Sequence, residues 1–287
     1  MIYCIGNFDG VHPGHISLIS QAKALGNEIA VLTFDPHPRS VFSPELPSFG
    51  LTNALQRETY LKDVGVTKVV TLPFTKQLAA LTAEEFATSI LRDMLKATVI
   101  VAGENFQFGK GRQGDMSLLS YFGSKLGFEV HSVSLFQTSG HSVSSTLIRK
   151  MLKSGNYADA VSLWRRNFIL QGEVMRGDQL GRTLGFPTAN LDWGTYQRPK
   201  FGVYASLTHL LDGRVLKSVT NLGQRPTVDG FEERFETHLF DYNEDLYGQK
   251  ISVELISYIR EEQRFDGLEA LKTQIAVDCE TAHAMLA

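Results

Sequence analysis

Short apolar runs alternate with helix-period segments in the first half of the chain. The apolar runs have strand length, are rich in β-branched residues and cover residues 2–5, 29–34, 68–72, 98–102 and 130–135. Ahead of the fourth run, Thr82 and Glu85 have the spacing of a capping box, followed by an apolar stripe at Phe86, Ile90, Leu91 and Met94. This alternation predicts a parallel sheet with helices on both faces, and such sheets bind ligands at the carboxyl ends of their strands.

After about Asn167 the pattern changes to closely spaced strands with few helices between them. These strands are expected over residues 168–175, 201–210, 215–222, 235–240 and 251–259. The dipeptide Asp212-Gly213 joins two of them, as in a two-residue hairpin. The spacing predicts an antiparallel barrel. A terminal helix follows, with Asp266 as its cap, Glu269 completing a capping box, and an apolar stripe of Leu268, Leu271 and Ile275.

A length of 287 residues exceeds what one hydrophobic core usually serves. Together with the change of pattern, it predicts two domains, residues 1–160 and residues 161–287. A helical segment over residues 144–165 is expected to bridge them.

The composition is ordinary for a globular protein, with 43% hydrophobic and 21% charged residues. A net charge of −3 provides no basic surface, which argues against a nucleic-acid-binding protein. Two isolated cysteines, Cys4 and Cys279, offer neither a zinc site nor a disulfide framework and fit a reducing cytoplasm, where we expect the protein. The apolar runs stay near strand length, so no membrane span is expected.

Residues 6–15 (GNFDGVHPGH) form a glycine-rich turn between the first strand and a plausible helix. The glycines permit a tight turn and close approach of the backbone to a ligand. His12 and His15 are three residues apart, so both can face one ligand at the start of the helix. Imidazoles beside unpaired backbone N–H groups suit a phosphate whose charge grows during displacement. The simpler interpretation is a turn whose histidines satisfy backbone groups, but two histidines in this frame favour a nucleotide site.

This turn resembles the signature of the nucleotidylyltransferase superfamily, whose members bind ATP and transfer a nucleotidyl group to a phosphate without a covalent enzyme intermediate. The resemblance implies that His12 and His15 are catalytic. It also implies that ATP is contacted by Gly6, Phe8, Asp9, His12 and His15.

A second superfamily element, hydroxyl residues and an Arg at the start of a late helix, matches Ser144, Ser145, Thr146 and Arg149. Hydroxyls at a helix N-terminus and an Arg one turn later suit the ATP phosphates that leave as pyrophosphate. A plain Ser N-cap is the alternative. Residues 33–39 and 103–109 resemble stretches of bacterial FAD synthetases, and the second implies an adenine or ribose contact from Asn105. A proline-stiffened loop explains residues 33–39 equally well. Ser142 stands where such enzymes often carry a basic residue.

Residues 181–190 (GRTLGFPTAN) resemble the signature of riboflavin kinases. Glycines let backbone N–H groups cradle phosphates, while Thr188 and Asn190 offer neutral oxygens two residues apart. Two such ligands, with phosphates and waters, match the incomplete protein shell that Mg²⁺ prefers. A turn with an Asn cap explains the glycines but not the whole string. The resemblance implies ATP contacts from Gly181, Arg182, Gly185, Pro187, Thr188 and Asn190.

Residues 221–227 and 235–241 also resemble riboflavin kinases, whose catalytic base carries over to Glu236. Strand alternation places Glu236 and His238 on one face, opposite Phe235, Thr237 and Leu239. We expect Glu236 inside the barrel mouth, where it orients the ribityl hydroxyl and accepts its proton late in phosphoryl transfer. Without the resemblance, a solvated strand residue is the better interpretation. Arg260 and Phe265 are expected flavin contacts.

The resemblance to the bacterial bifunctional riboflavin kinase/FAD synthetase family extends from Ile5 to about His283. It implies an α/β nucleotidylyltransferase domain with a Rossmann-like parallel sheet, followed by an antiparallel β-barrel riboflavin kinase domain with a terminal helix. The implied reactions convert riboflavin to FMN and FMN to FAD, with ATP as substrate and Mg²⁺ as cofactor in both. Residues 163–168 (LWRRNF) depart from the family, where a Leu-Gly-Arg-Pro-like run is common.

Three alternatives are weighed against this interpretation. The first is a kinase whose N-terminal domain only binds a nucleotide or flavin, and the intact histidines and Ser144–Arg149 element argue against it. The second is a flavin-binding regulator without turnover, which would need a damaged kinase loop. The third, an adenylyltransferase acting on another phosphate ester, would not need the C-terminal signature.

Overall fold

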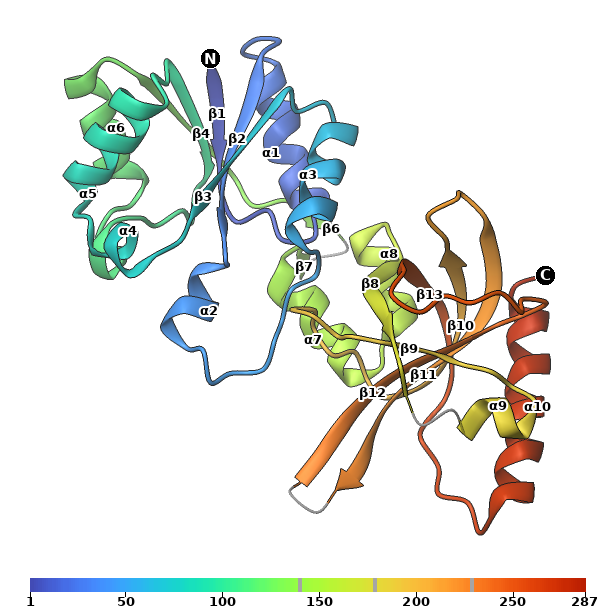
Figure 1. The fold of residues 1–287 in the computed structure, drawn as a ribbon. Coiled ribbons are helices and arrows are strands. Elements are labelled where there is room, and N and C mark those ends of the chain that lie inside the picture. Colours follow the sequence, from blue (N-terminus) through green and yellow to red (C-terminus); the bar gives the residue numbers. More distant parts are fainter. Residues whose placement is uncertain (139–140, 178–179, 228–229) are drawn as a thin grey trace. The chain divides into compact units, whose positions relative to one another are not determined.

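The computed structural model describes residues 1–138, 141–177, 180–227 and 230–287. The chain forms two compact units, Met1–Leu147 and Ile148–Ala287 (Figure 1). The units divide inside helix α7 (Ser145–Ser154), whereas the boundary expected at residues 160 and 161 lies inside α8 (Tyr157–Trp164). As a boundary between catalytic domains, that position stays a prediction.

A five-stranded parallel sheet forms the centre of the first unit, as the alternating pattern predicts. Its strand order is β3-β2-β1-β4-β5, so β1 pairs on both sides. The bounds are β1 Ile2–Ile5, β2 Ile29–Asp35, β3 Lys68–Pro73, β4 Val99–Gly103 and β5 Glu129–Val133. All four pairings are parallel, which places every carboxyl end along one edge of the sheet.

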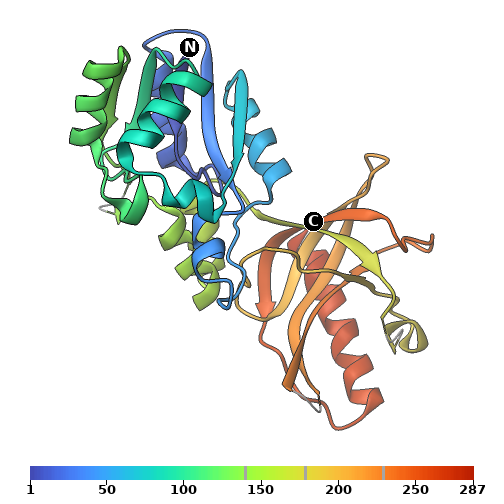
Figure 2. The same cartoon turned by 60° about the vertical axis from the view of Figure 1, so that its left-hand side comes forward.

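Helices cover both faces of this sheet (Figures 1 and 2), and alternating side chains of β1 enter two separate cores on these faces. Tyr3 and Ile5 lie in the core closed by η1 (Phe86–Met94) and α6 (Met116–Leu126). Ile2 and Cys4 lie in the core closed by α1 (Pro13–Lys23) and α3 (Ala54–Asp63). Both faces of the sheet are therefore covered, as expected. The shorter elements of this unit are α2 Pro38–Phe42, α4 Lys76–Ala80, α5 Ala83–Glu85, η2 Lys110–Arg112, β6 Gln137–Thr138 and β7 His141–Ser142.

The capping box at Thr82 and Glu85 is confirmed, because each residue bonds the backbone N–H of the other, at 2.8 and 3.1 Å. The apolar stripe behind it is only partly confirmed. Phe86 and Leu91 are buried, whereas Met94 is 47% exposed. The segment η1 is π-helical, with Leu95 N–H bonded to the carbonyl of Ile90. The wider turn moves Met94 away from the stripe that 3.6-residue periodicity predicts.

The second unit contains a closed barrel of six antiparallel strands in the order β10-β11-β12-β9-β8-β13, as expected. The bounds are β8 Phe168–Met175, β9 Ala189–Leu191, β10 Gly202–His209, β11 Val215–Thr227, β12 Gly230–Leu239 and β13 Lys250–Arg260. Sequence patterns do not predict strand β9, since its three residues are too few to show a period. It closes the barrel by pairing with both β8 and β12.

Hydroxyl side chains fill one part of the barrel interior and bond to one another. Ser206 Oγ lies 2.8 Å from Ser218 Oγ and 2.7 Å from Thr220 Oγ1, and Thr220 bonds Thr237 at 2.9 Å. Thr208 joins the same network through Ser218 at 2.9 Å. All five side chains are completely buried. The barrel interior is therefore occupied by its own side chains, and a ligand site is to be sought on its outer wall.

Two local expectations in this unit need correction. Asp212 and Gly213 do lie in the hairpin between β10 and β11, but five residues, 210–214, separate the two strands, with Leu210 N–H bonded to the carbonyl of Arg214 at 2.9 Å and Gly213 at φ +90°. Helix α10 (Leu268–Met285) begins after Gly267, and no side chain caps it. Gly267 at φ +117° adds an extended residue, so Asp266 lies one position too early to act as cap. Leu268 is 55% exposed, and the apolar stripe begins at Leu271.

Helix α8 ends where the sequence departs from the family that it resembles. Arg165, the residue after the helix, is left-handed at φ +61° and ψ 32°. This conformation costs an L residue roughly 1–2 kcal/mol and costs glycine little. Glycine also loses more backbone entropy on folding, so Arg165→Gly should raise the free energy of unfolding by about 1 kcal/mol or slightly less. Urea titration followed by tryptophan fluorescence measures this, since Trp164 and Trp193, the only two tryptophans, lie in the second unit.

Gly248 provides the reciprocal control. It has φ +73°, and a Cβ added there would have open space around it. Gly248→Ala should therefore lower the free energy of unfolding by about 1 kcal/mol through backbone strain alone. The opposite outcome would be a loss of stability in Arg165→Gly as large as that in Gly248→Ala. That result would show that contacts of the Arg165 side chain stabilise the fold by more than its left-handed backbone destabilises it.

Candidate active sites

The glycine-rich turn leads from the carboxyl end of β1 into α1. Helix α1 starts at Pro13, with His12 as the N-cap residue. The rings of His12 and His15 stack with centroids 3.7 Å apart, and the buried Phe8 ring lies 5.0 Å from His15. Both imidazoles therefore lie together at the N-terminus of a helix, the position where backbone N–H groups and the helix dipole favour a phosphate. Gly14 has little room for a side chain, because an added Cβ would lie 3.0 Å from His12 Cε1 and 3.2 Å from the carbonyl oxygen of Val143.

Asp9, a residue that is 4% exposed, orders this turn through its carboxylate. It accepts hydrogen bonds from the backbone N–H groups of Leu51 and Thr52, both at 3.0 Å, and from Thr52 Oγ1 at 3.1 Å. Thr33 Oγ1 fixes the other side of the turn by donating to the carbonyl of Asn7 at 3.0 Å. Asp9 is thus a structural anchor of the site, and its expected contact with ATP stays a prediction, as do those of Gly6 and Phe8.

The start of α7 meets the same turn. Ser145 Oγ donates to the carbonyl of Asp9 at 2.9 Å, although the two residues are far apart in sequence. Ser144 Oγ accepts from Leu147 N–H at 3.3 Å, so the plain N-cap considered as an alternative is also present. Thr146 follows in the first turn, and Arg149 shares a helix face with Ser145 because they are four residues apart.

Asn105 is exposed in the segment that follows β4. Because β4 pairs with β1, the carboxyl ends of the two strands lie side by side, and Asn105 follows the strand next to the glycine-rich turn. At the end of β2, the buried Arg57 donates to the carbonyl of Phe34 at 3.3 Å and lies 3.4 Å from Asp35. No sequence pattern points to Arg57, since an isolated Arg in a helix is usually solvated.

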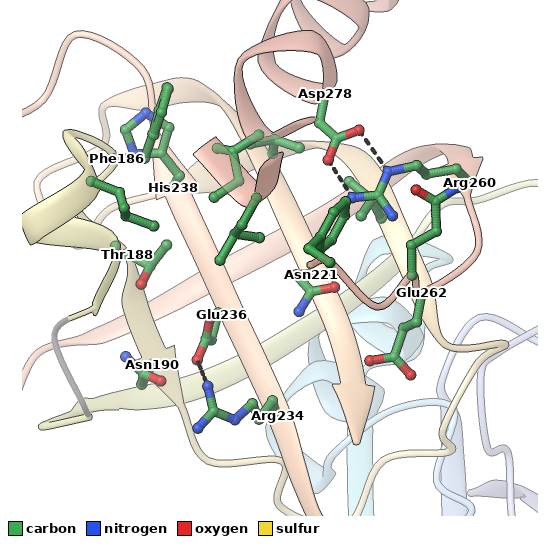
Figure 3. A pocket seen from close by; sticks show the side chains of 18 residues that line it. Phe186, Thr188, Asn190, Asn221, Arg234, Glu236, His238, Arg260, Glu262 and Asp278 are labelled. Carbon is green, nitrogen blue, oxygen red and sulfur yellow. Dashed lines mark hydrogen bonds and ion pairs between the residues drawn. The ribbon is translucent and has the colours of Figure 1, made fainter. Parts of the chain in front are cut away.

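A pocket of about 250 Å³ in the second unit lies between α10 and the outer wall of the barrel (Figure 3). Among the expected residues it brings together Gly181, Thr188, Asn190, Glu236, Arg260 and Phe265. The expectation that Glu236 lies inside the barrel mouth is wrong. The alternation along β12 is as predicted, and it points Thr237 into the barrel and Glu236 out of it, because hydroxyls already fill the interior.

Three polar residues form a row across the wall of this pocket. Glu236 on β12 pairs in register with Asn190 on β9 and with Asn221 on β11. Side chains of directly paired residues lie on one face of a sheet, so both amides flank the carboxylate. Arg234, two residues before Glu236 on β12, lies beside this row, with its Nη1 3.0 Å from Glu236 Oε1 (Figure 3). Asn221 begins the segment 221–227 that resembles riboflavin kinases, but no role was expected for it, and sequence patterns do not point to Arg234.

Gly177 and Gly181 let the backbone pass close to Asn190 and Thr188, the two expected ligands of Mg²⁺. A Cβ on Gly177 would lie 2.5 Å from Asn190 Nδ2, and one on Gly181 would lie 3.3 Å from Thr188 Oγ1 and collide with the carbonyl of Phe186. Gly185 has φ +91° after helix α9 (Leu180–Leu184). Thr188 and Asn190 therefore have backbone packed closely behind them. Among the described residues, no cluster of three or more His, Cys, Asp or Glu side chains could hold a metal. These two neutral oxygen ligands would need substrate phosphates and water to complete a Mg²⁺ shell, which is the usual Mg²⁺ arrangement.

His238 attaches this segment to the barrel. Its Nδ1–H donates to the carbonyl oxygen of Pro187 at 2.7 Å, and the Phe186 ring packs edge-on against it with centroids 5.7 Å apart. Burial lowers the pKa of the His238 imidazole, an effect that the hydrogen bond to Pro187 opposes. The ring therefore stays neutral near pH 7. Pro187 takes part through its carbonyl, whereas Arg182 and Gly185 do not line the pocket.

Arg260 is held rigidly at the α10 side of the pocket. Its Nε and Nη2 donate to the two carboxylate oxygens of Asp278 at 2.7 and 2.6 Å, and Gln274 bonds the same carboxylate at 3.0 Å. The Phe265 ring lies 5.8 Å from the guanidinium. Asp278 is absent from the residues expected here, although its spacing from Leu271 and Ile275 places it on the apolar stripe of α10, and an acidic residue there is a signal of a buried partner.

These two sites define a transferase with two nucleotide-using units in one chain. The FAD synthetase family model matches residues 1–147, and the riboflavin kinase family model matches residues 164–286. The chain belongs to the bacterial family of bifunctional riboflavin kinase/FMN adenylyltransferases. The member from Escherichia coli (strain K12) is 40% identical over 285 residues, which cover 98% of this chain and 91% of that protein. The member from Pseudomonas fluorescens is 39% identical over 288 residues, covering 99% and 92%.

A crystal structure described as a macrolide-efflux protein from Streptococcus pneumoniae has the same fold, with a TM-score of 0.85 and 32% identity over 98% of this chain and 93% of that one. In the part of this chain that the structure describes, no helix is both long and apolar enough to cross a membrane.

Proposed function

We propose that this chain phosphorylates riboflavin to FMN with one ATP and adenylylates FMN to FAD with a second, releasing pyrophosphate. The observation that carries the proposal is the row of Asn190, Glu236 and Asn221 in a pocket that also contains Thr188 and Arg260. Glu236 lies next to residues 181–190, the expected phosphate-binding segment, and so supplies a proton acceptor within reach of a phosphoryl donor.

In the kinase step, the ribityl hydroxyl oxygen forms a bond to the γ-phosphorus of ATP, and the bond from this phosphorus to the β–γ bridging oxygen breaks. Glu236 orients the hydroxyl and accepts its proton late in the transfer. Residues 181–190 bind the phosphates through backbone N–H groups, and Thr188 and Asn190 would hold Mg²⁺. When bound, Mg²⁺ neutralises the charge that develops on the transferred phosphoryl group. Arg260 and Phe265 bind the flavin, with Asp278 fixing the orientation of the guanidinium.

In the adenylyltransferase step, an oxygen of the FMN phosphate attacks the α-phosphorus of ATP and the bond to the bridging oxygen of pyrophosphate breaks. His12 and His15, stacked at the start of α1, donate hydrogen bonds to oxygens on which charge develops. Ser145, Thr146 and Arg149 bind the phosphates that leave, while Asn105 contacts the adenosine part. As in the kinase step, Mg²⁺ is the expected cofactor.

Incubation of the pure chain with riboflavin, ATP and Mg²⁺, followed by chromatographic separation of FMN from FAD, tests the proposal. We expect FMN to form first and FAD to follow. Formation of FMN without FAD, also from supplied FMN, would instead indicate a kinase with a non-catalytic N-terminal unit. Absence of both products would reject the proposal.

The metal assignment predicts a specific change in the Mg²⁺ requirement. Asn190→Ala should raise the Mg²⁺ concentration that half-saturates FMN formation by about tenfold, because one of two protein ligands is lost. Asn221→Ala is a matched control, since it removes an amide on the opposite side of Glu236 in the same row. Titrations of both variants should differ, and FAD formation from supplied FMN should be unchanged. Identical Mg²⁺ titrations for the two variants would remove Asn190 from the metal site.

A further inference from the structure

Arg260 lines the pocket with three of its five N–H donors already engaged. Nε and Nη2 donate to the carboxylate of Asp278 at 2.7 and 2.6 Å, and Nη1 donates to the carbonyl oxygen of Glu261 at 2.8 Å. A guanidinium group carries one donor on Nε and two on each Nη nitrogen. In the contacts among the described residues, one donor on Nη1 and one on Nη2 therefore remain for a ligand.

The orientation of this guanidinium is fixed by its surroundings. Asp278 holds it through two bonds from α10, and Gln274 Nε2 holds the carboxylate in turn at 3.0 Å (Figure 3). The side chains of Arg260 and Asp278 are only 18% and 6% exposed. The two remaining donors are therefore presented at fixed positions, as the recognition of a particular ligand geometry requires.

Asp278 also balances the charge of Arg260. A phosphate bound by this guanidinium would have to compete with a buried carboxylate that already forms two short bonds to it. Figure 3 shows Thr188 and Asn190, in the expected phosphate-binding segment, on the opposite side of the pocket from Arg260. The remaining donors of Arg260 therefore suit uncharged acceptors, such as ring nitrogens and carbonyl oxygens.

Apolar side chains surround Arg260 in the pocket. They come from β10, β11, α10 and the segment between β13 and α10, and they are Val203, Val219, Phe265, Leu271 and Ile275. A planar, uncharged ring system fits such walls. The isoalloxazine ring of riboflavin has two places where a ring nitrogen lies beside a carbonyl oxygen, namely N1 with O2 and N5 with O4. Each place offers two neighbouring acceptors, which match two neighbouring donors on Nη1 and Nη2.

We propose that Arg260 determines the flavin specificity of this pocket, because its remaining donors on Nη1 and Nη2 bind a ring nitrogen and the adjacent carbonyl oxygen of isoalloxazine. This inference rests on the proposed function. The ring lies against the apolar side chains next to α10, and the ribityl chain extends towards Glu236. Asp278 and Gln274 are positioning residues, since they act through the guanidinium.

The test compares kcat/KM for phosphorylation of riboflavin, 1-deazariboflavin and 5-deazariboflavin. Each analogue has carbon in place of one ring nitrogen, so it keeps the shape of riboflavin and loses one acceptor. The wild-type chain should use one of the two analogues about tenfold or more less efficiently than riboflavin, mainly through a raised KM, because a fixed charged donor loses its partner. The analogue that is discriminated against identifies the bound edge of the ring.

The variant Arg260→Met/Asp278→Leu should reduce this discrimination to about twofold or less. Both charges are removed together, since Arg260→Met alone would leave a buried carboxylate unpaired. The KM for ATP should stay unchanged. Arg260→Lys keeps the ion pair but lacks the forked donors, so it should also lose most of the discrimination, and it decides the question if the double variant does not fold.

Arg214→Met is the matched control. Arg214 also donates two bonds to one carboxylate, that of Glu244, but it does not line the pocket, so this variant should discriminate as the wild type does. Equal use of all three flavins by the wild type would overturn the inference while the proposed function stands. Wild-type discrimination in the Arg260 variants would do the same, with or without a raised KM for ATP. A wild-type chain that phosphorylates none of the three flavins would overturn the proposed function, and the inference with it.

Discussion

Glu236→Gln should lower FMN formation by about a hundredfold or more while leaving FAD formation from supplied FMN near the wild-type rate. General base catalysis by a positioned carboxylate contributes about 10²–10⁴-fold, and the amide keeps the shape of the side chain without its basicity. The side chain projects from the outer wall of the barrel between Asn190 and Asn221, so the substitution leaves the barrel interior untouched. Separate assays of the two half-reactions on one preparation measure both effects.

Glu262→Gln is the matched control for this prediction. Glu262 lines the same pocket, but its carboxylate accepts the backbone N–H of Gln224 at 3.1 Å and is outside the row of Glu236. We expect this variant to retain most of its FMN formation. If Glu236→Gln reduced both half-reactions equally, the two activities would share a site and their assignment to separate units would be wrong.

His15→Ala should have the complementary effect, a loss of FAD formation of about a hundredfold or more with riboflavin phosphorylation unchanged. Removing one preorganised donor from a site of developing negative charge typically costs about that much in rate. His15 stacks on His12 at the N-terminus of α1, while the turn itself is held by Asp9, Thr33 and Ser145. The melting temperature should therefore change little.

His131→Ala tests whether loss of any imidazole in this unit has the same effect. His131 lies on the edge strand β5, where its side chain is 40% exposed beside Glu129. FAD formation by this variant should match the wild type. A His15→Ala variant with a lowered melting temperature but normal FAD synthesis per folded molecule would show that His15 has a structural role only.

The elements that the sequence predicts best are those whose side chains obey one simple period. Strand β12 is an example, because its strict alternation is enough to place Glu236 and Thr237 on opposite faces. Local rules fail where another conformation replaces the expected one. The π-helical winding of η1 exposes Met94, and the extended Gly267 displaces the helix start from Asp266.

Some parts of the sites could not be predicted from sequence patterns for a different reason. They depend on contacts between strands and helices that are far apart in sequence. Which face of β12 is the inner one follows from the hydroxyl network among Ser206, Thr220 and Thr237, and no single strand reveals it. The proximity of Asn221 to Glu236 follows from the register of β11 with β12. An Arg two residues from a Glu on a strand, as Arg234 is, looks like ordinary surface chemistry until its burial is known.

Helix α10 forms one wall of the pocket in the second unit and follows all the barrel strands in the chain. Its side chains in this wall are Leu271, Ile275 and Asp278. Arg260 precedes its partner Asp278 by 18 residues, so the chain up to the end of β13 contains every barrel strand without this wall. A chain that ends before α10 would therefore contain residues 181–190 and Glu236 without the Asp278 partner of Arg260, and we expect it to lack the proposed flavin site.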